Sequence, residues 1–434
     1  MRFRASDVAA ATGGRLVGPD VELDGASFDT RSLRPGQLFV ALVAERDGHA
    51  FLADAERAGA GAALVSRPAD VVDLPTVLVA DTATALLALA AWGRQRTAAT
   101  VVGITGSVGK TSTKDLAVSA IGARRRVSAN ERSFNNEQGL PVTILNADER
   151  TEVLVLEMGM RGWGEISRLC EVARPDLGIV TTVGASHTER VGGVDGVAKA
   201  KRELVEALDP SGTAILNADD PRVDAMAEYT VAGVLRYGTA SMSDIHVTDL
   251  QLDELARARF TVRTPWGEAR IRLAVSGAHM AGNAAAAIAA AGVLGVPLDT
   301  VAASLERTGV SEMRMEVTRT QAGALVVNDA YNANPTSMMA ALDALAAMDA
   351  MRRIAVLGPM AELEDPDEAH RQVAAYAAEL GVQLVAVGTD LYGVAAAQDP
   401  LDALGVLGAG DAVLVKASRV AGLEWVARRL AGDA

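Results

Sequence analysis

Residues 103–112 read Gly-Ile-Thr-Gly-Ser-Val-Gly-Lys-Thr-Ser, and they follow the apolar run Ala-Thr-Val-Val at 99–102. This order of residue types predicts a strand, a glycine-rich loop and the start of a helix. Gly106 and Gly109 allow the backbone to turn so that its N–H groups point inward, and the helix N-terminus adds positive potential. The segment is therefore typical of a site for a polyphosphate.

The end of this loop carries the side chains that a nucleotide needs. Lys110 can reach the β- and γ-phosphates, and the hydroxyl of Thr111 can bind Mg²⁺. The spacing is a variant of the usual P-loop, and we predict that the chain binds ATP or GTP. The predicted phosphate-binding residues are Gly106, Ser107, Val108, Gly109, Lys110, Thr111 and Ser112.

Length and composition restrict the class of protein. A chain of 434 residues is long enough for about three domains. Half of the residues are apolar but only 3% are aromatic, so the cores must consist mainly of Ala, Val and Leu. The net charge of −14 argues against a general nucleic-acid-binding surface, and an anionic ligand would need a focused local site.

No targeting or membrane segment is predicted. Residues 1–7 lack the apolar core of a signal peptide, and the Ala-rich segment 281–296 is too short for a membrane span and contains Asn283 and Gly292. Cys170 is the single cysteine, which excludes an internal disulfide and fits a reducing compartment. We therefore expect a cytoplasmic protein without membrane insertion.

The pattern of strands and helices predicts an α/β fold with three domains, 1–98, 99–312 and 313–434. The third domain repeats the alternation of strand and helix that the second shows. Outside the middle domain, strands are predicted at 38–42, 62–65, 76–79, 324–328, 353–357, 383–387 and 411–415.

The middle domain combines two kinds of strand. Continuous apolar strands separated by helices predict a parallel sheet covered on both faces, with strands at 100–105, 153–158 and 177–183. Residues 240–275 instead predict antiparallel strands, 259–263 and 269–273, joined by the turn 264–267. A helix is predicted at 281–294.

Two of the predicted parallel strands lead to residues that can bind a metal. Glu157 lies at the end of one strand, and His187 follows another. The carboxyl ends of parallel strands meet at one edge of the sheet, where ligands bind. A single His after a strand is more often structural, but a Glu and a His beside a P-loop also suit Mg²⁺ or Mn²⁺.

The next helix places a lysine on its apolar face. Val197, Lys201, Leu204 and Leu208 are spaced by 4, 3 and 4 residues, whereas Lys199 lies on the polar face. Lys201 either extends to solvent along its apolar stem or is buried. Burial would lower its pKa and leave a neutral amine, which can take up CO₂ to form a carbamate, an anionic metal ligand. The spacing alone leaves both interpretations open.

Together, these motifs resemble those of the Mur ligases, ATP-dependent enzymes that build the peptide of the peptidoglycan precursor. The resemblance covers essentially the full length. Besides the P-loop, it rests on segments 134–137, 157–159, 186–189, 197–201, 217–220, 277–283, 329–335 and 411–419.

The segment 329–335, Asp-Ala-Tyr-Asn-Ala-Asn-Pro, is the most discriminating. It is similar to the loop of the ligases that attach D-alanyl-D-alanine to UDP-N-acetylmuramoyl-tripeptide. Ligases for the first or third residue carry His-containing versions, and the last domain here lacks the Asp-Asn-Pro-Arg motif of the third-residue ligases. Segments 27–32 and 35–42 resemble the family's UDP-sugar-binding segment. The resemblance implies a small α/β UDP-substrate domain, a central P-loop ATPase domain and a C-terminal Rossmann-like domain that binds the dipeptide.

The resemblance also implies a role for each matching residue. The implied catalytic residues are Lys110, Lys201, His187 and Arg314. The implied ATP contacts beyond the loop are Asn136, Asn283 at adenine, Arg314 from the third domain and Asp329 at the ribose. The implied ligands of two Mg²⁺ or Mn²⁺ ions are Thr111, Glu157, His187 and carbamylated Lys201. The implied substrate-binding residues are Ser27, Asp29, Thr30, Arg31, Tyr331, Asn332, Asn334, Lys416, Ser418 and Arg419.

Four positions depart from the family pattern. Met280 and Pro359 stand where Asn and an acidic residue are usual, Val108 replaces a small or polar residue, and Ala417 replaces Gly. None of these changes removes a charged group that is assigned above to phosphate or metal. Pro359 could change how the third domain approaches.

The implied reaction activates a carboxylate as an acyl phosphate, which the amine of the dipeptide then attacks. We expect a monomer that closes about linkers near residues 98 and 312. Two alternatives stay open. One is another Mur or folylpolyglutamate-type amide ligase. The other is a P-loop ATP-binding regulator, which would not need Glu157, His187 and a buried Lys201 together.

Overall fold

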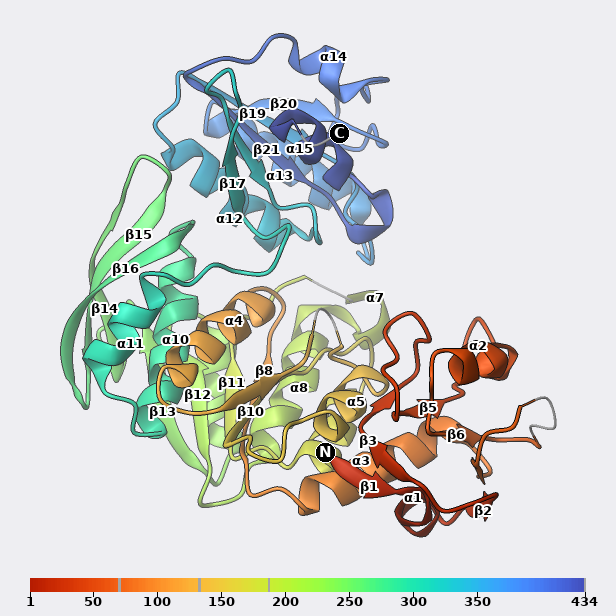
Figure 1. The fold of residues 1–434 in the computed structure, drawn as a ribbon. Coiled ribbons are helices and arrows are strands. Elements are labelled where there is room, and N and C mark those ends of the chain that lie inside the picture. The colour runs from red at the N-terminus through yellow and green to blue at the C-terminus, as the bar shows by residue number, and fades with distance from the viewer. Residues whose placement is uncertain (69–71, 132–133, 186–187, 433–434) are drawn as a thin grey trace.

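Three large sheets follow one another along the chain, each with helices packed against it (Figure 1). The computed structural model describes residues 1–68, 72–131, 134–185 and 188–432. Figure 1 shows the first sheet at one side of the middle sheet and the third sheet, in blue, beyond its upper edge. The α/β architecture predicted from the sequence is confirmed.

The first region contains a five-stranded sheet in the order β2-β7-β6-β5-β4, and β1 pairs separately with β3. Its strands are β1 (Arg2–Arg4), β2 (Arg15–Val17), β3 (Glu22–Asp24), β4 (Ala26–Ser27), β5 (Leu38–Val40), β6 (Ala62–Val65) and β7 (Thr76–Leu78). Its helices are α1 (Ala5–Thr12), η1 (Gly48–Phe51), α2 (Leu52–Arg57) and α3 (Thr82–Gln95). Asp81 begins α3, because its carboxylate accepts a hydrogen bond from the Thr84 N–H over 2.7 Å.

The middle region is a nine-stranded sheet in the order β16-β15-β14-β13-β12-β11-β8-β10-β9. The strands are β8 (Thr100–Thr105), β9 (Val127–Ala129), β10 (Val153–Glu157), β11 (Leu177–Val180), β12 (Thr213–Asn217), β13 (Gly233–Gly238), β14 (Ile245–Leu252), β15 (Arg257–Thr264) and β16 (Gly267–Ser276). The strands from β8 to β14 run parallel, while β15 and β16 continue the same sheet as an antiparallel hairpin. The predicted change from parallel to antiparallel strands is confirmed.

Helices cover both faces of the middle sheet. They are α4 (Lys110–Gly122), α5 (Gly139–Leu145), α6 (Glu165–Ala173), α7 (Thr188–Val191), α8 (Gly193–Glu206), α9 (Pro221–Asp224), η2 (Ala225–Tyr229), α10 (Met280–Val293) and α11 (Leu298–Leu305). The Ala-rich α10 is buried along nearly all of its length, because its small side chains allow close packing against the sheet. Within the described ranges, no helix is long and apolar enough to cross a lipid bilayer.

The third region is a five-stranded sheet in the order β17-β18-β21-β19-β20, parallel except for β17. Its strands are β17 (Glu316–Arg319), β18 (Leu325–Asn328), β19 (Arg352–Leu357), β20 (Gln383–Ala386) and β21 (Asp411–Lys416). Its helices are α12 (Pro335–Ala347), α13 (Pro366–Glu379), α14 (Pro400–Leu404), η3 (Arg419–Ala421) and α15 (Glu424–Ala431).

The first and middle regions share one hydrophobic core. A single cluster of buried side chains includes Leu64 and Leu86 from the first region and Ile144 and Leu154 from the middle region. Helix α3 packs against α5 and α6 across this junction. The described contacts therefore join the first two sheets closely on either side of the predicted boundary at residue 98.

Candidate active site

The loop between β8 and α4 has the geometry of a phosphate-binding loop. Gly106 and Gly109 have φ values of 152° and 86°, in the region that favours glycine. Thr181, directly after β11, holds the loop, because its hydroxyl donates to the Val108 carbonyl over 2.6 Å. The Lys110 ammonium donates to the Gly106 carbonyl over 2.6 Å, so it folds back over the loop.

This loop lies where the sheet reverses its direction of winding. Strand β8 has β10 on one side and β11 on the other, so the segments that follow these three strands meet at one edge. Ligands in open α/β sheets bind at such a switch point, outside the carboxyl ends of the strands. The predicted meeting of the P-loop with the end of β10 is confirmed.

Glu157, the last residue of β10, is 2% exposed and is held at both carboxylate oxygens. The Thr111 hydroxyl donates to Oε2 over 2.7 Å, and the Asn135 side-chain amide donates to Oε1 over 2.8 Å. The P-loop hydroxyl and the strand-end carboxylate are thus adjacent, as the sequence predicted.

These groups fit a divalent cation. A carboxylate and a hydroxyl are the hard oxygen donors that Mg²⁺ prefers, and Glu157 and Thr111 present them beside a phosphate-binding loop. Among the residues that the structure describes, no three His, Cys, Asp or Glu side chains lie close enough to share a metal. The predicted ligand His187 lies outside the described residues.

Lys201 is buried, with 2% of its surface exposed, on the inner face of α8. Burial lowers the pKa of its amine well below the usual value, and the charge of Lys110 lowers it further. The alternative in which Lys201 extends to solvent is therefore wrong. Because the charge of Lys110 affects the pKa of Lys201, the Lys201 amine lies within electrostatic reach of the P-loop.

The third region approaches the P-loop through Arg314 and the first turn of α12. The Arg314 guanidinium lies over the Tyr331 ring, 4.2 Å from its centroid. Burial is the main cause of the lowered pKa of Lys110; the Glu157 carboxylate opposes this shift, and the Arg314 charge adds to it. At α12, a Cβ atom added to Gly184 would come within 2.7 Å of the Thr336 hydroxyl. Arg314 thus lies within electrostatic reach of Lys110, and its contact with ATP stays a prediction.

Asp329 and Lys416 form a buried ion pair rather than two separate binding groups. Their side chains are 14% and 3% exposed, and Lys416 Nζ lies 2.6 Å from Asp329 Oδ2. Lys416 Nζ also donates to the Asn332 carbonyl over 2.8 Å. The pair therefore fixes the loop after β18, which carries the predicted substrate-binding residues.

Other predicted substrate-binding residues of the third region also stabilise the fold. Asn334 caps α12, because its side chain accepts from the Ser337 N–H over 2.9 Å. The buried Ser418 hydroxyl accepts from the Ala361 N–H over 2.9 Å. Arg419 forms an ion pair with Glu424 at 2.7 Å.

The two predicted nucleotide-binding asparagines differ in their contacts with the P-loop. Asn283, on α10, is so close to Gly109 that a Cβ atom there would lie 2.6 Å from its Oδ1. Asn136 accepts hydrogen bonds from the N–H groups of Gln138 and Gly139 over 3.1 and 3.0 Å. Asn283 thus lies against the loop, whereas the described contacts of Asn136 serve the start of α5.

Residues 27–31 of the first region reach the middle region through an aromatic contact. The rings of Phe28 and Phe134 have centroids 5.4 Å apart, and Phe134 directly precedes Asn135 and Asn136 in the chain. Arg31 is 88% exposed along its side chain and pairs with Asp29 at 2.6 Å. The predicted UDP-substrate segment thus lies next to the loop that leads to the nucleotide site.

Sequence reasoning did not select Asn135, Thr181 or Thr336. Asn135 belongs to the segment 134–137 that carried the resemblance, so its position was a signal. Thr181 and Thr336 gave no such signal, because their importance depends on which loops meet at the sheet edge.

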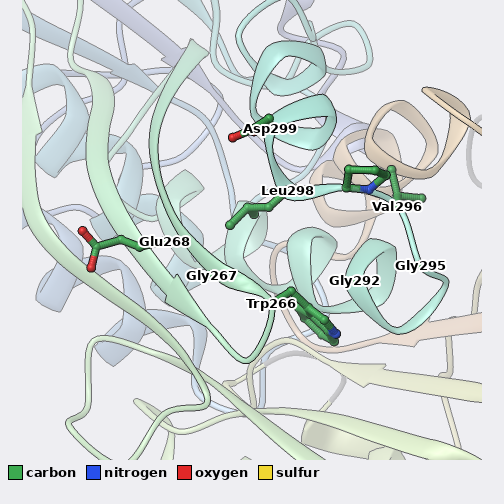
Figure 2. A pocket seen from close by; sticks show the side chains of 9 residues that line it. Trp266, Gly267, Glu268, Gly292, Gly295, Val296, Leu298 and Asp299 are labelled. Atoms are coloured by element: carbon green, nitrogen blue, oxygen red, sulfur yellow. The ribbon is translucent and has the colours of Figure 1, made fainter.

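One hollow of the structure lies away from these residues (Figure 2). It has a volume of about 410 Å³ and is formed by the β15–β16 turn and the connection from α10 to α11. Trp266 covers Gly292, where a Cβ atom would overlap the indole ring. None of the predicted site residues is among its described lining residues.

Comparison with known proteins agrees with this geometry. The chain matches the Mur ligase middle domain over residues 104–291 and the Mur ligase, glutamate ligase domain over residues 313–433. The chain belongs to the Mur ligase family.

Within this family, the similarity points to one branch. The chain is 41% identical to the UDP-N-acetylmuramoyl-tripeptide–D-alanyl-D-alanine ligase of Mycobacterium tuberculosis, with 94% of this chain and 92% of the relative covered. It is 37% identical to the ligase of the same name from Escherichia coli, with 96% of each covered. A crystal structure of MurF from Acinetobacter baumannii matches with a TM-score of 0.90 and 29% identity, covering 100% of this chain and 99% of that one. MurF from Thermotoga maritima in complex with ADP matches with a TM-score of 0.83 and 27% identity, covering 94% and 97%.

Proposed function

We propose that this chain uses ATP to join D-alanyl-D-alanine to UDP-N-acetylmuramoyl-tripeptide, giving the UDP-N-acetylmuramoyl-pentapeptide, ADP and phosphate. The observation that carries the proposal is the meeting of Lys110, Thr111 and Glu157 at one sheet edge with Arg314 of the third region nearby. The full-length similarity to ligases of this name supports the choice of substrates.

The reaction needs local positive charge because two anions must meet. The terminal carboxylate of the tripeptide attacks the γ-phosphorus, the bond to the β-phosphate oxygen breaks, and ADP leaves. The amine of the dipeptide then attacks the acyl carbon, and phosphate leaves from the tetrahedral intermediate. Lys110, Arg314 and the N–H groups of the P-loop stabilise the negative charge on the transferred phosphoryl group.

A divalent cation fits the same site. Thr111 and Glu157 would hold Mg²⁺ or Mn²⁺, with His187 as a further ligand by the family resemblance. When bound, the cation offsets the charge of the phosphates and polarises the transferred group. A carbamate on Lys201 would add a second carboxylate-like ligand, and its buried amine of lowered pKa supports this assignment. We propose two such cations.

The two substrates would approach from opposite sides of the nucleotide. Residues 27–31 of the first region are the proposed contacts for the UDP-sugar. The loop after β18 and the segment 416–419 are the proposed contacts for the dipeptide, held in place by the Asp329–Lys416 pair. The ATP supply and the nucleotide-linked substrate place the proposed reaction in the cytoplasm, and we expect a monomer to suffice.

The test is phosphate release from ATP by the purified protein with Mg²⁺ and UDP-N-acetylmuramoyl-tripeptide, with and without D-alanyl-D-alanine. We expect release that requires both substrates and a pentapeptide product by mass spectrometry. Release that responds to a single amino acid instead would assign the chain to a sister ligase. ATP hydrolysis that ignores both substrates would leave only an ATP-binding regulator.

The carbamate has its own test. In ¹³C-bicarbonate, we expect the wild-type protein to show one slowly exchanging carbamate resonance by NMR, because Lys201 offers a neutral buried amine. The variant Lys201→Arg should lack this resonance and lose activity by at least about tenfold, since one of the proposed cation ligands is gone. Lys199→Arg, on the polar face of the same helix, is the matched control and should keep the resonance.

A further inference from the structure

The amide side chain of Asn130 spans the backbone of Glu157. Its Oδ1 accepts from the Glu157 N–H over 2.8 Å, and its Nδ2 donates to the Glu157 carbonyl over 2.9 Å. The same Nδ2 donates to the Phe134 carbonyl over 2.8 Å. Asn130 is 2% exposed, so these bonds form away from solvent. A reversed amide would place donor against donor, and the contacts therefore determine its orientation.

The place of Asn130 in the sheet explains this contact. Strand β9 pairs with β10 only as far as the register Ala129 opposite Val155, and Asn130 is the next residue. Beyond that point, β10 continues to Glu157 without a strand on this side. The Asn130 amide supplies the missing donor and acceptor, so it replaces one peptide unit of the strand ladder.

Two further contacts tie Asn130 and the nearby Asn135 to the active site. The buried Lys114 ammonium, one helical turn after Lys110, donates to the Asn130 carbonyl over 3.0 Å. Farther along the chain, the Asn135 side-chain amide donates a hydrogen bond to Oε1 of the Glu157 carboxylate. Asn130 and Asn135 therefore fix Glu157 at its backbone and at its side chain, respectively.

We infer that Asn130 is a positioning residue for the divalent-cation site. By completing the ladder at the end of β10, it sets the direction in which the Glu157 carboxylate leaves the strand. This inference rests on the proposed function, in which Glu157 binds the cation. It assigns no contact between Asn130 and the cation itself.

The test measures cation affinity directly. The probe is Mn²⁺, titrated into the full-length protein with saturating ADP and followed by the EPR signal of free Mn²⁺. We expect Asn130→Ala to weaken Mn²⁺ binding about tenfold or more, as removal of groups that orient metal ligands generally does. ADP affinity in EDTA should change by less than about twofold, since Asn130 has no described contact with the P-loop backbone.

Asn146 offers a matched control. Its amide makes the same two-point contact with the Ala26 backbone, accepting from the N–H over 3.0 Å and donating to the carbonyl over 2.8 Å. Asn146→Ala should lower the thermal midpoint like Asn130→Ala, yet keep wild-type Mn²⁺ affinity. If both variants lose stability and both keep Mn²⁺ affinity, Asn130 is structural and the inference is overturned.

A milder variant guards against a protein that fails to fold. Asn130→Asp keeps an acceptor for the Glu157 N–H but loses both donors. We expect intermediate Mn²⁺ affinity, and wild-type affinity in this variant would contradict the inference. Wild-type protein that binds no Mn²⁺ would instead overturn the metal assignment of Glu157, which separates the failure of the two proposals.

Discussion

The buried pair of Asp329 and Lys416 shows how single residues support this site without contacting the reacting atoms. Each was assigned from the resemblance to a ligand, the ribose for Asp329 and the peptide substrate for Lys416. In the structure they neutralise each other, and Lys416 also fixes the Asn332 carbonyl. A buried charge that loses its partner is strongly destabilising, whereas removal of both charges costs less.

This difference leads to a prediction for the pair. Lys416→Met should lower the free energy of unfolding by about 3 kcal/mol, because Asp329 is left buried and unpaired. The double variant Asp329→Asn/Lys416→Met should recover part of this loss. Urea unfolding of the four proteins in a double-mutant cycle measures the coupling. Additive effects would show that the two side chains do not act as a pair.

At the scale of elements, helix α13 fixes the loop after β19 through a buried histidine. His370 Nε2 accepts from the Met360 N–H over 2.9 Å, so Nδ1 carries the proton and lies 2.5 Å from the Pro366 carbonyl. Burial lowers the pKa of His370, although the Pro366 carbonyl and Asp367 oppose this effect. Protonation of Nε2 would remove the acceptor for Met360.

The stability of the third region should therefore decrease in mild acid. Between the lowered folded pKa of His370 and the ordinary value near 6.5, the unfolded chain binds the extra proton. His370 therefore contributes fully to the free energy of unfolding above about pH 6.5. This contribution is lost as the pH falls from there toward the lowered pKa of the folded state. Thermal unfolding from pH 8 to pH 5 should show a shallower decline for His370→Gln than for wild type. His246→Gln on β14 is the control, and an equal slope in all three proteins would contradict the prediction.

The β14–β15 hairpin extends beyond its own sheet into the third region. Ala256 at its tip is fully buried in the core of the third region, and Leu255 packs against the same cluster. The Asp349 N–H donates to the Glu254 carbonyl over 3.1 Å. The third region is therefore attached to the middle region at the hairpin tip as well as through the chain near residue 312.

Loosening the hairpin tip should affect ATP binding from a distance. Leu255→Ser removes apolar contact with the third region, and we expect the KM for ATP to rise about threefold or more because Arg314 is held less firmly. Hydrogen exchange at residues 348–352 should also become faster. Leu250→Ser, on the exposed part of β14, is the control with unchanged KM. Equal behaviour of the two variants would show that the tip has no role in placing Arg314.

At the scale of the whole molecule, the distribution of the cores indicates where movement is easiest. The first and middle regions share one core, so separating them would expose a large apolar surface. The third region has its own two core clusters and contacts the rest through the hairpin tip, the linker and α12. The sequence-based prediction of closure about both linkers stays a prediction, and these contacts favour the joint near 312.

Fluorescence energy transfer can separate the two joints. Cysteines introduced at the exposed positions Glu22 and Val406 report on the third region, and those at Glu22 and Met242 report on the first. Cys170 should not be labelled, because burial raises the pKa of its thiol to about 12. With an ATP analogue and UDP-N-acetylmuramoyl-tripeptide, we expect transfer to change for the first pair alone. A change in the second pair would instead locate movement near residue 98.

The sequence by itself determined the features that depend on local spacing. The P-loop, the buried strand that ends in Glu157, the apolar face that carries Lys201 and the hairpin with strands 259–263 and 269–273 follow from residue types a few positions apart. Hydrophobic periodicity and glycine placement act over such distances, so these predictions were confirmed. Strand ends were less accurate, and the strand predicted at 177–183 ends at Val180.

Only the tertiary structure decided which distant residues complete the site. Asn130 and Glu157 are 27 residues apart, and Asp329 and Lys416 are 87 apart. Their contacts depend on which strands become neighbours and where each strand ends, and no local pattern records either. The same reason explains the shared core across residue 98 and the hairpin tip in the third region, because packing joins apolar surfaces irrespective of their order in the chain.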